Sequence, residues 1–175
     1  MSDIKKVTIG GTVFTIIFGT LLHFVFQWSG NNPIVGIVGA VNESTWEHLK
    51  LLFFPMLFYT IFEYFAYGKD TANFIPARAV SILAGMFIIV SSFYTYTGIL
   101  GKNLLPLDIG TFILGTVGAY FIGYKIMKSD ALSSKKMNIA GIVILILLIL
   151  ALAVFTFSPP EIGLFLDPST GKYAL

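Results

Sequence analysis

The chain has 175 residues, of which 56% are hydrophobic and 11% are charged. Soluble domains contain about 25% charged residues, and the mean hydropathy here is +0.86. The composition therefore predicts a multi-pass protein of the cell membrane that is surrounded by the lipid bilayer. The formal net charge of +2 is too small to indicate nucleic-acid binding, and the absence of cysteine excludes disulfides, thiolate catalysis and sulfur-ligated metals.

Five segments are apolar enough to cross a bilayer as helices, which requires about 20 residues each. They lie at residues 7–28, 48–67, 77–100, 107–126 and 138–157. The sequence thus predicts an all-α protein with one transmembrane domain over residues 1–175, built as a five-helix bundle. Eight basic residues fall on the side of the N-terminus and three on the opposite side, which places the N-terminus in the cytoplasm and the C-terminus outside.

A shorter apolar segment, residues 33–41 (PIVGIVGAV), follows the first span. A helix of that length extends only about 13 Å, which is too short to cross the bilayer. We expect it to form a short interfacial or re-entrant segment on the outer side.

The stretch Asn42–Lys50 (NESTWEHLK) concentrates ionisable groups at the start of the second span. Its Ser44 and Glu47 have the spacing of a capping box, and Trp46 is typical of the membrane interface. Lys50 lies near the positive end of the helix dipole, so it requires a partner, and Glu47 is the nearest one in the sequence.

The two histidines of the chain, His23 and His48, are predicted to lie at a similar depth in the outer half of the bundle. Each could be a hydrogen-bonded packing residue, or the two could form a joint site with Glu43 and Glu47. These four residues are candidate ligands of a divalent metal. No H-E-x-x-H or similar motif supports a metal, so the sequence leaves the cofactor undetermined.

Ser91 and Thr95 share one face of the outer half of the third span, at i,i+4 spacing. They either form hydrogen bonds between helices or line a cavity that opens outward.

Several other residues have structural interpretations. Pro55 is expected to kink the second span. Glu63 and Arg78, at the cytoplasmic ends of the second and third spans, are expected to pair or to extend to water. Asp108 is expected to be the N-cap of the fourth span.

The fourth span carries small residues at every fourth position, namely Thr111, Gly115, Ala119 and Gly123. Such a stripe is typical of a close helix–helix contact. The neighbouring helix belongs either to the same chain or to a second copy in a homodimer.

After the last span, the tail contains an apolar anchor, an Asp167-Pro168 turn and an aromatic residue. We expect it to fold back over the outer face and to cover Asn42–Lys50. The candidate ligand-binding residues are therefore His23, Glu43, Glu47, His48, Lys50, Ser91, Thr95 and Asp167.

The motifs N-E-S-x-W-E-H-L-K-L at 42–51 and L-F-x-D-P-x-T-G-x-Y at 164–173 resemble those of an uncharacterised family of small prokaryotic integral-membrane proteins, a domain of unknown function. The resemblance implies a multi-span membrane protein and no particular activity.

Three functions remain open on the sequence alone. The preferred one is an outward-facing polar pocket that binds or transports a small polar solute, an ion or a lipid head group. The second is a membrane-embedded enzyme, with or without a metal, that acts on a lipid or lipid-linked substrate. The third is an accessory or structural subunit of a membrane complex.

Overall fold

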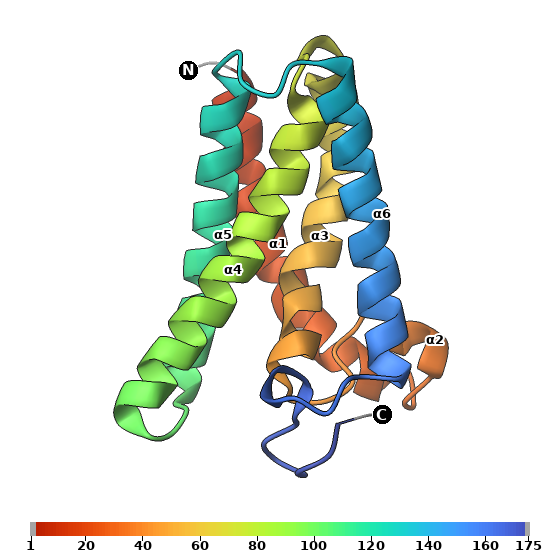
Figure 1. Ribbon diagram of the computed structural model, residues 1–175, viewed down its shortest axis with the longest axis vertical. Helices are drawn as coiled ribbons and strands as arrows, with labels where there is room; N and C mark the ends of the chain where they lie inside the picture. Colours follow the sequence, from red (N-terminus) through yellow and green to blue (C-terminus); the bar gives the residue numbers. More distant parts are fainter. Residues whose placement is uncertain (1–2, 174–175) are drawn as a thin grey trace.

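Five long helices form the bundle in the computed structural model, which describes residues 3–173 (Figure 1). They are α1 (Asp3–Trp28), α3 (Thr45–Ala66), α4 (Phe74–Leu100), α5 (Leu105–Met127) and α6 (Lys135–Phe157). Each is long and apolar enough to cross a membrane, and the described residues contain no strand. The predicted five-span helical bundle is confirmed, although each helix begins slightly earlier than predicted.

Three short helices complete the fold: α2 (Pro33–Gly36), η1 (Gly68–Asp70) and η2 (Gly163–Phe165). In the apolar segment 33–41 only α2 is α-helical, and it begins where the Asn32 side chain accepts a hydrogen bond from the Ile34 N–H at 2.9 Å. The segment α2 and the C-terminal tail lie at the same end of the bundle, the lower end in Figure 1, which we call the tail end.

The core lies between α3 and α4. Leu52, Phe53 and Met56 of α3 and Ile82 of α4 are completely buried there. Large apolar side chains are instead exposed on the outward surfaces of the long helices, Phe87 at 72% being one example. Exposed apolar helix faces of this kind are expected where the surroundings are lipid rather than water.

The small-residue stripe of α5 lies at its contact with α4. A Cβ atom added to Gly115 would lie only 2.9 Å from the carbonyl oxygen of Gly85, and one added to Gly123 would overlap the Ser81 hydroxyl. The stripe therefore packs against a neighbouring helix of the same chain, because small residues let the two backbones approach closely.

The first and third helices are also in close contact, at Gly19. A Cβ atom there would overlap the carbonyl oxygen of Leu51, the group that Pro55 leaves without its usual donor within α3. Glycine at this position thus lets α1 approach α3, and this approach brings together the parts of the two helices that lie toward the tail end.

At the opposite end from the tail, Glu63 and Arg78 form an ion pair, and both side chains are completely buried. Tyr67 joins them, since its hydroxyl accepts a hydrogen bond from Arg78 at 3.0 Å and donates one to Glu63 at 2.9 Å. The Arg78 guanidinium also lies 4.9 Å from the ring centre of Tyr120. Glu63 and Arg78 therefore pair with each other, and neither side chain extends to water.

The N-cap prediction for Asp108 is wrong. The cap residue of α5 is Leu104, because Pro106 fits the first turn of a helix and lets it begin earlier. The Asp108 carboxylate instead accepts hydrogen bonds from the Tyr96 hydroxyl and, at 3.2 Å, from the Asn103 amide. It therefore ties the ends of α4 and α5 together.

Only half of the predicted capping box forms. Ser44 caps α3 by accepting the Glu47 N–H at 3.3 Å, as predicted. Glu47 does not reach back, because the Ser44 N–H is bonded to the Asn42 side chain at 3.0 Å and the Glu47 carboxylate has other partners.

Candidate functional site

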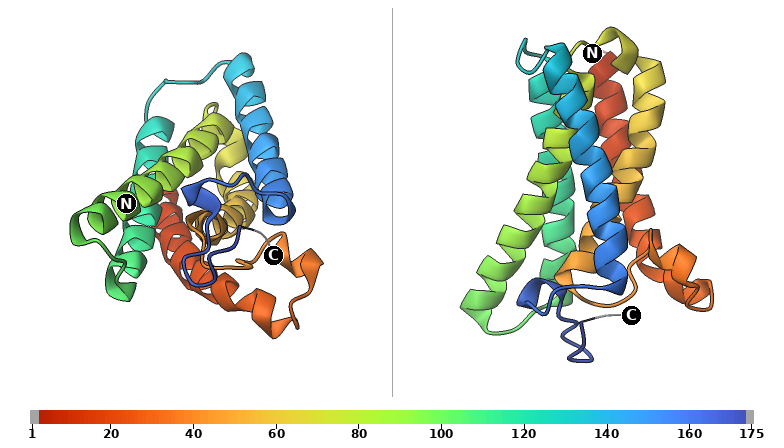
Figure 2. Two further views of the ribbon diagram at one scale, coloured as in Figure 1. Left: turned by 60° about the horizontal axis from the view of Figure 1, so that its bottom comes forward. Right: turned by 45° about the vertical axis from the view of Figure 1, so that its right-hand side comes forward.

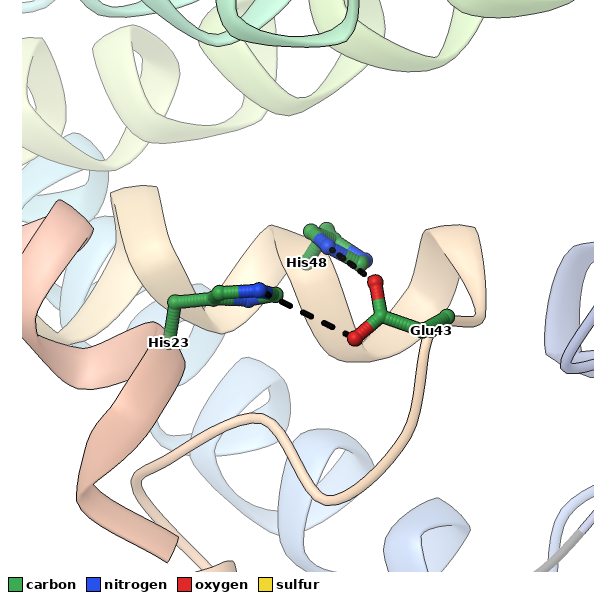
Figure 3. A group of neighbouring side chains, drawn as sticks. All are labelled: His23, Glu43 and His48. Atoms are coloured by element: carbon green, nitrogen blue, oxygen red, sulfur yellow. Dashed lines mark ion pairs between the residues drawn. The ribbon is translucent and has the colours of Figure 1, made fainter. Parts of the chain in front are cut away.

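Two imidazole rings and one carboxylate meet at the tail end of the bundle (Figure 3). The Glu43 carboxylate lies between the rings, with Oε1 3.8 Å from Nε2 of His23 and Oε2 3.5 Å from Nε2 of His48. The two ring centres are 5.2 Å apart. We call His23, Glu43 and His48 the His–Glu cluster, and its formation brings together residues up to 25 positions apart in the sequence.

Each member of the cluster comes from a different element. His23 belongs to α1, Glu43 to the loop before α3, and His48 to the first turns of α3 (Figure 3). Their side chains are 28%, 49% and 32% exposed, respectively, so solvent and small molecules can reach all of them.

The helix cap fixes the orientation of His48. Its Nδ1 lies 2.8 Å from the backbone carbonyl oxygen of Ser44, the cap residue. A carbonyl oxygen can only accept a hydrogen bond, so Nδ1 carries a proton and Nε2 is the ring nitrogen that lies toward Glu43. The Nδ1 of His23, in contrast, is buried and has no hydrogen-bond partner within the described chain.

Two cavities meet at the cluster. The smaller one has a volume of about 190 Å³ and is lined by His23, Glu43 and Asp167, among others. The larger one has a volume of about 700 Å³ and is lined by all members of the His–Glu cluster. His23, Glu43 and Ser169 line both cavities, so the cluster lies at their junction.

The larger cavity extends from the cluster into the space between α1, α3, α4 and α5, where α4 and α5 lean away from α6 toward the tail end (Figures 1 and 2). Most of its wall is apolar, formed by Phe24, Leu51, Ile89, Phe93, Leu105, Ile109 and Phe112. Its charged lining residues are Glu43 and Asp108, and no Lys or Arg is among the described residues that line either cavity.

The tail folds back over this end of the bundle, as predicted (Figure 2). Phe165 of η2 is buried against Trp46 and Phe155, with ring centres 4.8 and 5.4 Å away. Trp46, which the sequence suggested as an interface residue, thus anchors the tail. This anchor places Pro168 and Ser169 against the larger cavity.

Asp167 holds the turn of the tail together. Its carboxylate accepts hydrogen bonds from the Ser169 N–H at 2.8 Å, the Ser169 hydroxyl at 2.7 Å and the Thr170 hydroxyl at 2.9 Å. Burial alone would raise the pKa of Asp167, but these hydrogen bonds outweigh it and hold the pKa below its ordinary value. Asp167 lines the smaller cavity as an ionised carboxylate whose oxygens already have partners.

Glu47 and Lys50 lie in a separate buried network, with side chains 3% and 0% exposed. The Lys50 Nζ donates to Glu47 Oε2 at 2.6 Å, to the Gly36 carbonyl oxygen at 2.7 Å and to the Thr156 hydroxyl at 2.5 Å. Glu47 also accepts the Val41 N–H at 3.0 Å. Neither side chain lines the two cavities. The network joins α3, α6 and residues 36–41, and so positions the loop that carries Glu43.

The structure does not bring the other polar candidates to the cluster. The Ser91 hydroxyl donates to the Phe87 carbonyl oxygen of its own helix at 2.6 Å, and Thr95 is exposed. From α4, the larger cavity is lined by Ile89 and Phe93 instead. Serine in a helix commonly satisfies its hydroxyl in this way, so a polar face need not be a cavity wall.

Sequence reasoning missed Thr156 and the cavity role of Asp108. Thr156 carries the sole hydroxyl group of α6 and is the only polar residue in its stretch 139–157, which was the signal that the sequence offered. Asp108 gave no signal beyond its place near a helix start, and the folded chain places it in the lining of the larger cavity.

Comparison with known proteins places the chain in one family, whose model matches residues 1–175. The chain belongs to a family of unknown function, DUF6512. This match confirms that the resemblance in the sequence is to an uncharacterised family. No curated protein and no solved structure matches the chain. The function of this DUF6512 protein therefore has to be argued from its site.

Proposed function

We propose that this membrane protein binds an amphipathic molecule, with the apolar chain of the ligand between α1, α3, α4 and α5 and its head group at the His–Glu cluster. The observation that carries the proposal is the larger cavity, which is apolar over most of its wall and polar where His23, Glu43 and His48 line it. Its volume of about 700 Å³ lies within the range of ligand pockets.

The apolar wall favours an amphiphile over a small polar solute. A polar solute would leave Ile89, Phe93 and Phe112 in contact with water, whereas an alkyl chain would remove that apolar surface from water. Such burial contributes about 25 cal/mol per Å² of apolar surface. A bilayer is also a ready source of such ligands, because the cavity lies between membrane-spanning helices.

The charges of the lining restrict the head group. Glu43, Asp108 and Asp167 are acidic, and the described lining residues include no Lys or Arg, the two residues that would carry a permanent positive charge. A free anionic head group would be repelled by these carboxylates, since like charges close to one another repel. The cluster alone therefore suits a neutral head group that donates hydrogen bonds, such as a hydroxyl, or a cationic one, such as an amine.

Binding can be tested with three probes that share one alkyl chain: dodecanol, dodecylamine and dodecyl phosphate. Metal-free protein in lipid nanodiscs would be studied by thermal unfolding and by native mass spectrometry. We expect the alcohol and the amine to raise the unfolding temperature and to remain bound, and the phosphate to do neither.

The variant that tests the cavity is Leu105→Trp with Ile109→Trp, because both side chains line it and both are exposed. The matched control is Leu114→Trp with Val117→Trp, which places the same bulk on exposed positions of α5 that do not line it. The first variant should lose binding of the probes and the second should keep it. Equal binding by the two variants, or no binding by the unmodified protein, would contradict the proposal.

A further inference from the structure

We propose that the His–Glu cluster is a binding site for a divalent transition metal of the zinc class, with an open coordination position that faces the larger cavity. His23, Glu43 and His48 each offer one ligand atom, and these atoms all lie within 4.8 Å of one another.

The distances within the cluster suit a metal better than they suit direct hydrogen bonds. The separations of 3.8 Å for His23–Glu43 and 3.5 Å for His48–Glu43 exceed those of strong charge-assisted hydrogen bonds. Ligand atoms at about 2.0–2.1 Å from a tetrahedral zinc ion are about 3.4 Å from one another. Small rotations of these partly exposed side chains would therefore bring the three ligand atoms around one ion.

The hydrogen bond of His48 to the helix cap gives an independent argument from geometry. Because Nδ1 donates to the Ser44 carbonyl oxygen, Nε2 is the nitrogen left to bind an ion, and it lies on the side of the Glu43 carboxylate. A histidine whose second nitrogen is bonded to a backbone carbonyl is the usual arrangement of a metal ligand.

Two of the carboxylates that the sequence suggested for a binding site already have other hydrogen-bond donors. Glu47 is occupied by Lys50, Thr156 and the Val41 N–H, and is 2% exposed, so it is not a ligand. Asp167 is occupied by Ser169 and Thr170. Two imidazoles and one carboxylate remain, a set that binds zinc and leaves a fourth position for water or a ligand.

The fourth position connects the metal with the proposed amphiphile site. All ligands of the cluster line the larger cavity, so a group bound in the cavity can reach the ion. The metal would also offset the acidic lining and would admit an anionic head group that the metal-free cluster repels. The metal site itself does not depend on the proposed function, since it rests on the three ligands alone.

The test is zinc titration of the full chain, with its affinity tag removed and after treatment with a chelator, followed by calorimetry. We expect saturable binding of one zinc ion per chain. Glu43→Gln and His48→Ala should each weaken it by more than about tenfold. The matched control is Glu161→Gln, which removes the same charge at an exposed position after α6 and should leave the affinity unchanged.

Cobalt provides a second readout, because visible absorption of the cobalt-loaded protein reports tetrahedral nitrogen and oxygen ligands. The spectrum should be present in the Glu161→Gln protein and absent from Glu43→Gln, with thermal unfolding confirming that both are folded. Absence of saturable zinc binding, or equal zinc affinity in Glu43→Gln and Glu161→Gln, overturns the metal site. Loss of amphiphile binding in the cavity variant is a separate result, so either proposal can fail while the other stands.

Discussion

The Nζ atom of Lys50 lies 2.6 Å from Oε2 of Glu47, and the pair is shielded from solvent in the network that holds the loop of Glu43. The two residues are on the same face of α3, yet their other partners come from residues 36–41 and from α6. This ion pair therefore links three segments at the tail end of the bundle, and it helps to hold the loop that carries Glu43.

Replacing Lys50 by methionine should destabilise the protein strongly. The substitution leaves the buried Glu47 carboxylate without its cation, which costs about 3–5 kcal/mol. Thermal and chemical unfolding in detergent would measure the loss. The double variant Lys50→Met with Glu47→Gln removes the uncompensated charge, so it should be more stable than Lys50→Met alone. A double variant that is less stable would show that the charge pair is not the main interaction.

Gly19→Ala should separate α1 from α3, because its methyl group would overlap the Leu51 carbonyl oxygen. Overpacking of this kind costs about 1–3 kcal/mol. Since α1 carries His23, zinc affinity should fall together with thermal stability. The control is Gly98→Ala in α4, where a Cβ would meet nothing within 4 Å. The control should be neutral or stabilising, because alanine favours a helix over glycine by about 0.5–1 kcal/mol. Equal effects of the two substitutions would contradict the close contact at Gly19.

The turn of the tail should loosen in acid. The pKa of Asp167 is lowered in the folded protein from its ordinary value of 3.8, so its carboxylate stabilises the turn above that value. The stabilisation is lost as the pH falls through the lower folded pKa, when protonation removes the acceptors of Ser169 and Thr170. Fluorescence of Trp46, which packs on Phe165, would follow this change in a Trp28→Phe background. Asp167→Asn should abolish the low-pH transition, and an unchanged transition in that variant would assign it to another group.

The orientation of the bundle can be tested by labelling, because the natural chain has no cysteine. The distribution of basic residues predicts that the tail end faces the outside. Lys102→Cys, between α4 and α5 at that end, should react with a membrane-impermeant maleimide in intact cells. Lys128→Cys, at the opposite end of α5, should react only after the cells are opened. The reverse pattern would place the His–Glu cluster on the cytoplasmic side.

The sequence by itself determined the features that depend on local order along the chain. The five spans follow from long apolar runs, and the cap of Ser44 follows from its place directly before α3. The small residues on α5 marked a close contact because their four-residue period places them on one helix face. The fold-back of the tail was also predictable, since its apolar and turn residues are unlike those of a free terminus.

Only the tertiary structure decided which of the candidate polar side chains meet at one site. From the sequence, Glu43 and Glu47 were both candidates for a joint site with the two histidines, although Glu47 was also the nearest partner of Lys50. In the folded chain Glu47 is bonded to Lys50 and to Thr156, which is 109 positions away, while Glu43 alone reaches His23 and His48. A carboxylate binds the cation or donor that helix packing brings to it, and in this bundle α1 approaches α3 closely at Gly19, on the two helices that carry His23 and His48.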